Sequence, residues 1–286
     1  MQRITPHLWY DKEAKEAAAL YTTLFDNSRV KQSTTLHDTP SGSVDLVSIE
    51  LAGQEFALIS AGPYFKFNPS VSFLVSCATK DEVDALWREL AKGGKVLMEI
   101  GAYPFSEHYG WTQDRFGLSW QVMVAGQRPI QQKITPVMMF AEQQSGKSEE
   151  AIRFYTSVFD NSETGEIFRH DNGMVAFAGF TLDGQQFAAM DSPRPNGFTF
   201  NEAVSFIVNC ETQQEIDYYW EKLSADPKAE QCGWLKDRYG FSWQVTPTAM
   251  NRMLASGDEK KIARVTKAFL QMKKFDLAKL EDAFNG

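Results

Sequence analysis

The sequence predicts an α+β protein in which a βαβββ module is used twice in each of two halves, with curved, mostly antiparallel sheets and a helical C-terminal tail. The main observation is an internal repeat: GWTQDRFGLSWQV at 110–122 returns as GWLKDRYGFSWQV at 233–245, with nine of thirteen positions identical. The predicted strands also cluster around single helices. A chain of 286 residues with 43% hydrophobic content is long enough to bury two cores.

The first module of each half opens with matching strands, RITPHLWY at 3–10 and KITPVMMF at 133–140. In the first half, Asp11 is expected to cap a helix with apolar residues at helical spacing, and 151–162 repeats that helix. Turn residues then separate three strands in each half. We place them at 30–37, 44–51 and 55–60, and at 166–170, 174–182 and 186–190.

The second module of each half starts with an apolar strand, VSFLVSC at 71–77 and VSFIVNC at 204–210. Each strand leads into a helix with a capping box, formed by Thr79 with Glu82 or Thr212 with Glu215. After the second copy, the sequence predicts two tail helices, one amphipathic around 262–272 and one at 277–284. The predicted domains are 1–126 and 130–246, followed by a helical extension at 247–286.

Composition narrows the classes of function. A formal charge of −8 and the lack of a basic stripe argue against nucleic-acid binding. The sequence has no secretion signal and no run of eighteen apolar residues, so we expect a soluble, cytoplasmic protein with no membrane partner. Cys77, Cys210 and Cys232 form no CxxC pair, which fits a reducing compartment. Cys77 and Cys210 end matching strands and are interpreted as buried, small apolar residues.

The repeated motif has a structural and a functional interpretation. Ser119 and Gln121 alternate with Trp120 and Val122, so this strand can line a cavity or anchor a core. The adjoining Asp114-Arg115 and Asp237-Arg238 pairs are interpreted as turn residues with surface ion pairs, in preference to catalytic groups.

Three of the four histidines are interpreted as surface residues: His37 and His170 in turns, and His108 in a loop. His7 differs because it shares a strand face with Trp9 and has Val137 as its counterpart in the second half. It is either a satisfied core histidine or a catalytic residue. In the second case it would act as a general base or as a sole imidazole ligand near neutral pH.

The sequence resembles the glyoxalase/bleomycin-resistance/dioxygenase (vicinal oxygen chelate) superfamily, and within it the PhnB-like branch. The resemblance rests on ITPHLWYDKEAKEAAALYTTLFDNS, on GPYFKFN before VSF, on the tandem GW motif and on the tail MKKFDLAKLEDAF. It implies two complete superfamily domains in one chain, and thus a monomer with an internal pseudo-dimer or a weak homodimer. Members often carry a demethylubiquinone methyltransferase-like label, but no Gly-rich loop follows the first strand here, which argues against methyl transfer.

The resemblance also implies positions for metal ligands, and two groupings of them remain open. In the first grouping, each half of the chain supplies one ligand set: His7, Ser60, Ser72 and Gln121 in the first half, and Val137, Asp191, Ser205 and Gln244 in the second. In the second grouping, each set combines modules from both halves, as in dimeric relatives. One set is then His7, Ser60, Ser205 and Gln244, and the other is Val137, Asp191, Ser72 and Gln121. Neither set has enough imidazole, carboxylate or thiolate for a classical metal quartet, so no metal ligand is assigned.

Two functional hypotheses follow. In the first, the protein binds a small molecule without a classical metal quartet, as bleomycin-resistance proteins do. In the second, it is an isomerase, lyase or dioxygenase, with His7 or Asp191 as base and a divalent metal as the cofactor. The candidate cavity residues are Trp9, Ser60, Ser72, Gln121, Asp191, Ser205 and Gln244, and His7 is the candidate catalytic residue.

Overall fold

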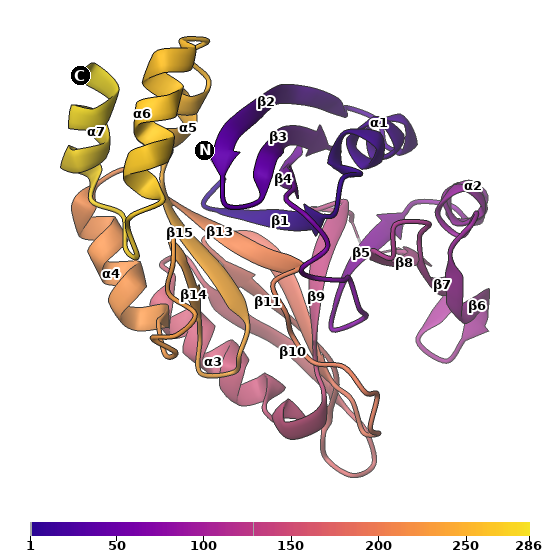
Figure 1. Cartoon of the computed structure of the whole chain (residues 1–286). Coiled ribbons are helices and arrows are strands. Elements are labelled where there is room, and N and C mark those ends of the chain that lie inside the picture. Colours follow the sequence, from indigo (N-terminus) through magenta and orange to yellow (C-terminus); the bar gives the residue numbers. More distant parts are fainter. Residues whose placement is uncertain (1, 128) are drawn as a thin grey trace. The chain divides into compact units, whose positions relative to one another are not determined.

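The computed structural model describes residues 2–127 and 129–286, so Met1 and Arg128 lie outside the described residues (Figure 1). The chain divides into two compact units. Unit 1 combines Met1–Phe65 with Asn201–Gly286, and unit 2 is Lys66–Phe200. The compact units and the sequence repeats therefore divide the chain differently: each unit joins one module from the first half to one module from the second.

Unit 1 contains a mixed, mostly antiparallel sheet in the order β14-β15-β13-β1-β4-β3-β2. Its strands are β1 (Ile4–Tyr10), β2 (Arg29–Thr39), β3 (Gly42–Leu51), β4 (Gln54–Ser60), β13 (Val204–Cys210), β14 (Trp234–Lys236) and β15 (Ser242–Pro247). Its helices are α1 (Ala14–Leu24), α4 (Gln213–Leu223), α5 (Thr248–Leu254), α6 (Glu259–Phe269) and α7 (Leu277–Asn285). Helices α1 and α4 pack on one face of the sheet.

Unit 2 contains a second mixed sheet in the order β10-β11-β12-β9-β5-β8-β7-β6. Its strands are β5 (Val71–Cys77), β6 (Lys95–Tyr103), β7 (Ser106–Gln113), β8 (Ser119–Val124), β9 (Ile134–Phe140), β10 (Glu163–Arg169), β11 (Val175–Leu182) and β12 (Gln185–Asp191). Its helices are α2 (Lys80–Leu90), the short 3₁₀ helix η1 (Glu142–Gln144) and α3 (Ser148–Val158). Helices α2 and α3 pack on one face of the sheet.

The two modules of each unit meet through a pair of antiparallel strands at the centre of the sheet. In unit 1, β1 pairs with β13 and places His7 opposite Ser205. In unit 2, β5 pairs with β9 and places Ser72 opposite Val137. Side chains alternate between the face that packs on the helices and the opposite face, which we call the inner face. The predicted α+β fold of βαβββ-like modules is confirmed, although the last module, β13-α4-β14-β15, has two strands after its helix in the described residues, where about three were expected.

The local predictions agree closely with the observed elements. Strands β5 and β13 have the predicted bounds. Both predicted threonine caps form: the side chain of Thr79 accepts from Glu82 N at 3.2 Å, and that of Thr212 accepts from Glu215 N at 3.2 Å. Each partner glutamate accepts in return from the residue before the cap, Ala78 N at 2.7 Å and Glu211 N at 2.5 Å. The prediction that Asp11 caps the first helix is wrong. That helix begins at Ala14, whose N–H donates to Ser60 Oγ at 3.0 Å.

The tail packs on unit 1 and forms the two predicted helices as α6 and α7, although α6 ends at Phe269, and it adds a short helix, α5, that was not predicted. Met253, Leu254, Val265, Phe275 and Leu280 make one apolar cluster with Leu36 of β2 and Leu46 of β3. Figure 1 shows α5, α6 and α7 in yellow tones at the end of the chain. Strand register puts Leu46 opposite Ile59, and Ile59 opposite Trp9, so the tail covers part of the inner face of unit 1. No helix within residues 2–127 and 129–286 is long and apolar enough to cross a membrane.

Candidate functional site

The inner face of unit 1 is centred on His7. Strand alternation in β1 puts His7 and Trp9 on this face and Leu8 and Tyr10 against the helices. His7 is 5% exposed. Its ring meets that of Trp234 edge to face, with 5.3 Å between centroids. Trp9 in turn packs against Trp234, at 6.1 Å, and Phe65, at 5.1 Å. The result is a polar imidazole among aromatic side chains.

A short hydrogen-bond chain orients His7. Gln244 Nε2 donates to Ser205 Oγ at 3.0 Å, and Ser205 Oγ lies 3.4 Å from His7 Nδ1. Ser205 is fully buried, because β13 lies between β1 and β15 in the sheet. Burial lowers the pKa of His7 from 6.5 to about 3, since desolvation penalises the charged imidazolium. His7 is therefore neutral at physiological pH and suited to hydrogen bonding.

The inner face of unit 2 carries an apolar version of the same arrangement. Val137 is the repeat counterpart of His7 and lies in a cluster with Leu74 and Ala188. Gln121 Nε2 donates to Ser72 Oγ at 2.7 Å, as Gln244 does to Ser205. Here the amide oxygen is also paired, because the Tyr109 hydroxyl donates to Gln121 Oε1 at 2.8 Å. Burial raises the pKa of Tyr109, so its hydroxyl keeps its proton.

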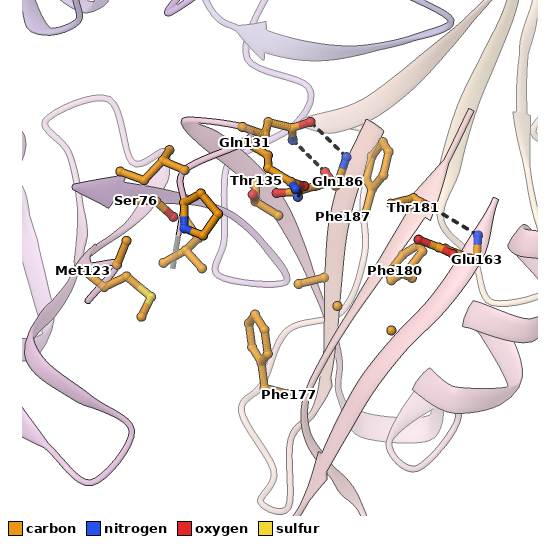
Figure 2. Close-up of a pocket in the computed structure, with 18 residues that line it drawn as sticks. Ser76, Met123, Gln131, Thr135, Glu163, Phe177, Phe180, Thr181, Gln186 and Phe187 are labelled. Atoms are coloured by element: carbon orange, nitrogen blue, oxygen red, sulfur yellow. Dashed lines mark hydrogen bonds between the residues drawn. The ribbon is translucent and has the colours of Figure 1, made fainter. Parts of the chain in front are cut away.

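Unit 2 also contains a cavity of about 390 Å³, which we call the unit 2 cavity. Figure 2 shows Met123, Phe177 and Phe180 among the residues that line it. Polar groups lie along its margin, where Gln186 Nε2 donates to Gln131 Oε1 at 2.9 Å (Figure 2). The cavity and the apolar cluster around Val137 share their lining, namely Leu74, Met123, Phe177 and Ala188.

Ser60 and Asp191 lie on the helix side of their sheets, away from the inner faces. Register pairs Ser60 with Tyr10 and Asp191 with Phe140, both buried against the helices. Asp191 Oδ1 accepts from the N–H groups of Gly146 and Ser148 at 2.9 and 3.1 Å, and Oδ2 accepts from Val175 N at 3.0 Å. Asp191 thus holds the start of α3, as Ser60 holds the start of α1.

The structure brings the other predicted site residues together in two groups. His7, Trp9, Ser205 and Gln244 share the inner face of unit 1, and Ser72 and Gln121 share that of unit 2. This is the grouping with exchanged modules. Sequence reasoning missed Trp111, whose Nε1 donates to Ser119 Oγ at 2.8 Å, and its repeat equivalent Trp234. The invariant GW dipeptide of the repeat was the available signal, because both tryptophans lie on a strand next to the Gln strand.

The other three histidines lie on neither inner face. His37 and His170 are exposed, as predicted, but His37 lies within strand β2 and not in a turn. The prediction that His108 lies in a surface loop is wrong, because it is half-buried in β7. Its Nε2 lies 2.6 Å from Asp84 Oδ1, so it links β7 to α2. The cysteines at the strand ends, Cys77 and Cys210, are fully buried, and burial raises the pKa of each thiol to about 12.

Paired βαβββ modules that enclose an inner face define a protein of the glyoxalase-like fold. Glyoxalase I from Zea mays has this fold, with a TM-score of 0.54, 11% identity and coverage of 88% of this chain and 96% of that chain. The chain belongs to the 3-demethylubiquinone-9 3-methyltransferase family, whose model matches residues 2–123 and 132–246.

A solved PhnB protein from Bacillus cereus is also similar. It is described as a 3-demethylubiquinone-9 3-methyltransferase, and the two chains are 36% identical with a TM-score of 0.41. The similarity covers 43% of this chain and 100% of that chain. No curated protein matches the sequence.

A divalent metal, which the fold family implies, does not fit the inner-face residues. In the described part of the chain, no group of three or more His, Cys, Asp or Glu side chains could hold a metal ion. In unit 1, His7 is joined on its face by Ser205 and Gln244, and in unit 2 its place is taken by Val137. Serine hydroxyls and amides bind divalent transition metals poorly, so these donor sets fall short of a metal centre.

The loop after the first strand does not match the kind of loop that would bind the methyl donor implied by the family description. Residues that bind a nucleotide-like cofactor commonly form a Gly-rich turn between a strand and a helix N-terminus. In this chain Asp11-Lys12-Glu13 connects β1 to α1. We therefore do not carry methyl transfer over from the family description to this protein.

Proposed function

We propose that this PhnB-like protein binds a small, mainly apolar molecule in the unit 2 cavity without the help of a metal. The cavity itself is the observation that carries the proposal. Its volume of about 390 Å³ lies within the range of roughly 300–1,000 Å³ typical of small-molecule sites. Leu74, Met123 and Phe177 supply the apolar wall of such a site.

The polar groups at the margin favour a ligand with one hydrogen-bonding end. Ser76, Thr135 and Gln186 line the cavity beside its apolar wall. A few polar groups at the edge of an apolar cavity orient a ligand, while the buried apolar area provides most of its affinity. This combination supports a molecule with a hydrocarbon or aromatic body and a single hydroxyl, carbonyl or amine.

The proposal is tested with the neutral fluorescent probe N-phenyl-1-naphthylamine. We expect the probe to bind with a rise in fluorescence and a 1:1 stoichiometry. Ser76→Trp adds an indole at the cavity wall and should abolish this signal. Phe168→Trp is the matched control, because it adds an indole on the exposed surface of β10. Equal probe binding by Ser76→Trp and the control would overturn the proposal.

A further inference from the structure

The inner face of unit 1 presents two polar atoms that have no protein partner. His7 uses Nδ1 for its hydrogen bond and Gln244 uses Nε2. That leaves His7 Nε2 and Gln244 Oε1 without a hydrogen-bond partner among residues 2–127 and 129–286. The two residues are only 5% and 9% exposed. Neither atom is fully buried, so both are open to solvent and to a ligand.

The hydrogen-bond chain decides which of these atoms donates. The Ser205 hydroxyl accepts from Gln244 Nε2, and His7 Nδ1 is the one acceptor for its own proton among the described residues. A neutral imidazole that accepts at Nδ1 carries its proton on Nε2. Unit 1 therefore offers an N–H donor from His7 and a carbonyl acceptor from Gln244. Both side chains hydrogen-bond to the same serine oxygen, so the donor and the acceptor belong to one inner face.

Unit 2 shows that the fold itself does not require this free pair. Its Gln121 has the same bond to a serine, but Tyr109 pairs the amide oxygen. The repeat equivalent of Tyr109 in unit 1 is Cys232, which lies directly before the GW dipeptide. The equivalent of His7 in unit 2 is Val137, which offers no donor. Unit 1 therefore has both the donor and the acceptor, whereas in unit 2 the donor is absent and the acceptor is paired.

The surroundings of the pair are apolar and aromatic. Trp234 meets the His7 ring edge to face, and Trp9 packs against Trp234. Ile59 and Ile207 lie on the same face by register, opposite Trp9 and Gln244 respectively. All four of these side chains are half-buried, so the face is reachable from solvent. Indole and isoleucine surfaces favour a flat, apolar ligand body.

We propose that unit 1 holds a second binding site for a neutral aromatic molecule bearing a hydrogen-bond acceptor next to an N–H or O–H donor. The acceptor binds His7 Nε2–H and the donor binds Gln244 Oε1. An aryl carboxamide has both groups on one flat body. Neither protein group is charged, which favours a neutral ligand over a carboxylate. The site is separate from the unit 2 cavity and does not depend on the function proposed for it.

Benzamide and acetophenone are the probes, because they have the same shape and differ by an amide NH₂ in place of a methyl group. We expect NMR titration to show benzamide binding about ten-fold more tightly, since acetophenone leaves Gln244 Oε1 unpaired. In Gln244→Met the benzamide affinity should fall about ten-fold to that of acetophenone. In His7→Val both probes should bind more weakly. Gln121→Met is the matched control in unit 2 and should change neither affinity.

Two measurements on the unaltered protein keep the test decisive if a variant fails to fold. The nitrogen shifts of His7 should show its proton on Nε2, and benzamide should move the Nε2 signal. Equal affinity for the two probes, no binding of either, or a proton on Nδ1 would each overturn the proposal. The Ser76→Trp variant distinguishes the two sites. Its benzamide affinity should equal that of the unaltered protein, and a loss of binding would assign benzamide to the unit 2 cavity instead.

Discussion

Asp114 accepts a hydrogen bond from the indole nitrogen of Trp120, with 2.9 Å between Oδ2 and Nε1. Asp237 repeats this bond with Trp243 at 2.8 Å. In each copy the other carboxylate oxygen accepts two backbone N–H groups of the turn that precedes the Gln strand. The sequence prediction of turn residues is confirmed. Their placement at the surface is wrong, because both carboxylates are nearly fully buried.

Replacing Asp237 should therefore destabilise the protein strongly. Asp237→Asn loses the charged acceptor that binds Trp243 and the turn, so we expect the free energy of unfolding to fall by about 2 kcal/mol. Denaturant unfolding followed by tryptophan fluorescence measures this. Asp171→Asn is the matched control, because Asp171 is exposed. A loss as small as that of the control would show that the buried bond contributes little.

The tail should stabilise unit 1 through Phe275, which is buried in the cluster with Leu36 and Leu280. Phe275→Ala removes a buried ring and should cost about 3 to 5 kcal/mol. Hydrogen exchange should then rise in α6 and α7 while α2 and α3 of unit 2 stay protected. Phe105→Ala, at an exposed ring, should have little effect. Equal exchange changes in both units would contradict this assignment.

His7 should make stability fall in mild acid. Its pKa is about 3 in the folded protein, against 6.5 ordinarily, so between these values the unfolded chain binds a proton that the folded chain excludes. Stability is therefore lost as pH falls through this window, by roughly 1 kcal/mol per pH unit. His7→Val lacks this loss, so its stability should improve relative to wild type from pH 6.5 down to 4. Parallel pH profiles for the two proteins would contradict a buried, neutral His7.

Metal should be neither bound nor required. The inner-face donors are too few for a transition-metal site, so protein purified without chelator should hold no stoichiometric metal. Zn²⁺, Ni²⁺, Mn²⁺ or Fe²⁺ should not raise the melting temperature, and EDTA should not lower it. One metal ion per chain, with a thermal shift that disappears in His7→Val, would instead support the metal-dependent enzyme.

Local sequence patterns were sufficient to predict most elements of the fold. Strand alternation put His7 and Trp9 on one face, and the capping boxes located the starts of α2 and α4. The same reasoning could not predict which face of the sheet Ser60 and Asp191 occupy. Which face a residue of β4 or β12 takes depends on its register with β1 or β9, and register is a contact between distant segments.

The sequence by itself determined the four repeated modules and the tail helices α6 and α7, because these depend on local periodicity and on repeats, but it did not predict the short helix α5 or the missing third strand of the last module. Only the tertiary structure decided which modules share a sheet. Strands β5 and β13, VSFLVSC and VSFIVNC, are so alike that β1 could pair with either by its local chemistry. Long-range packing selects β13 for β1, and thereby brings His7, Ser205 and Gln244 onto one face.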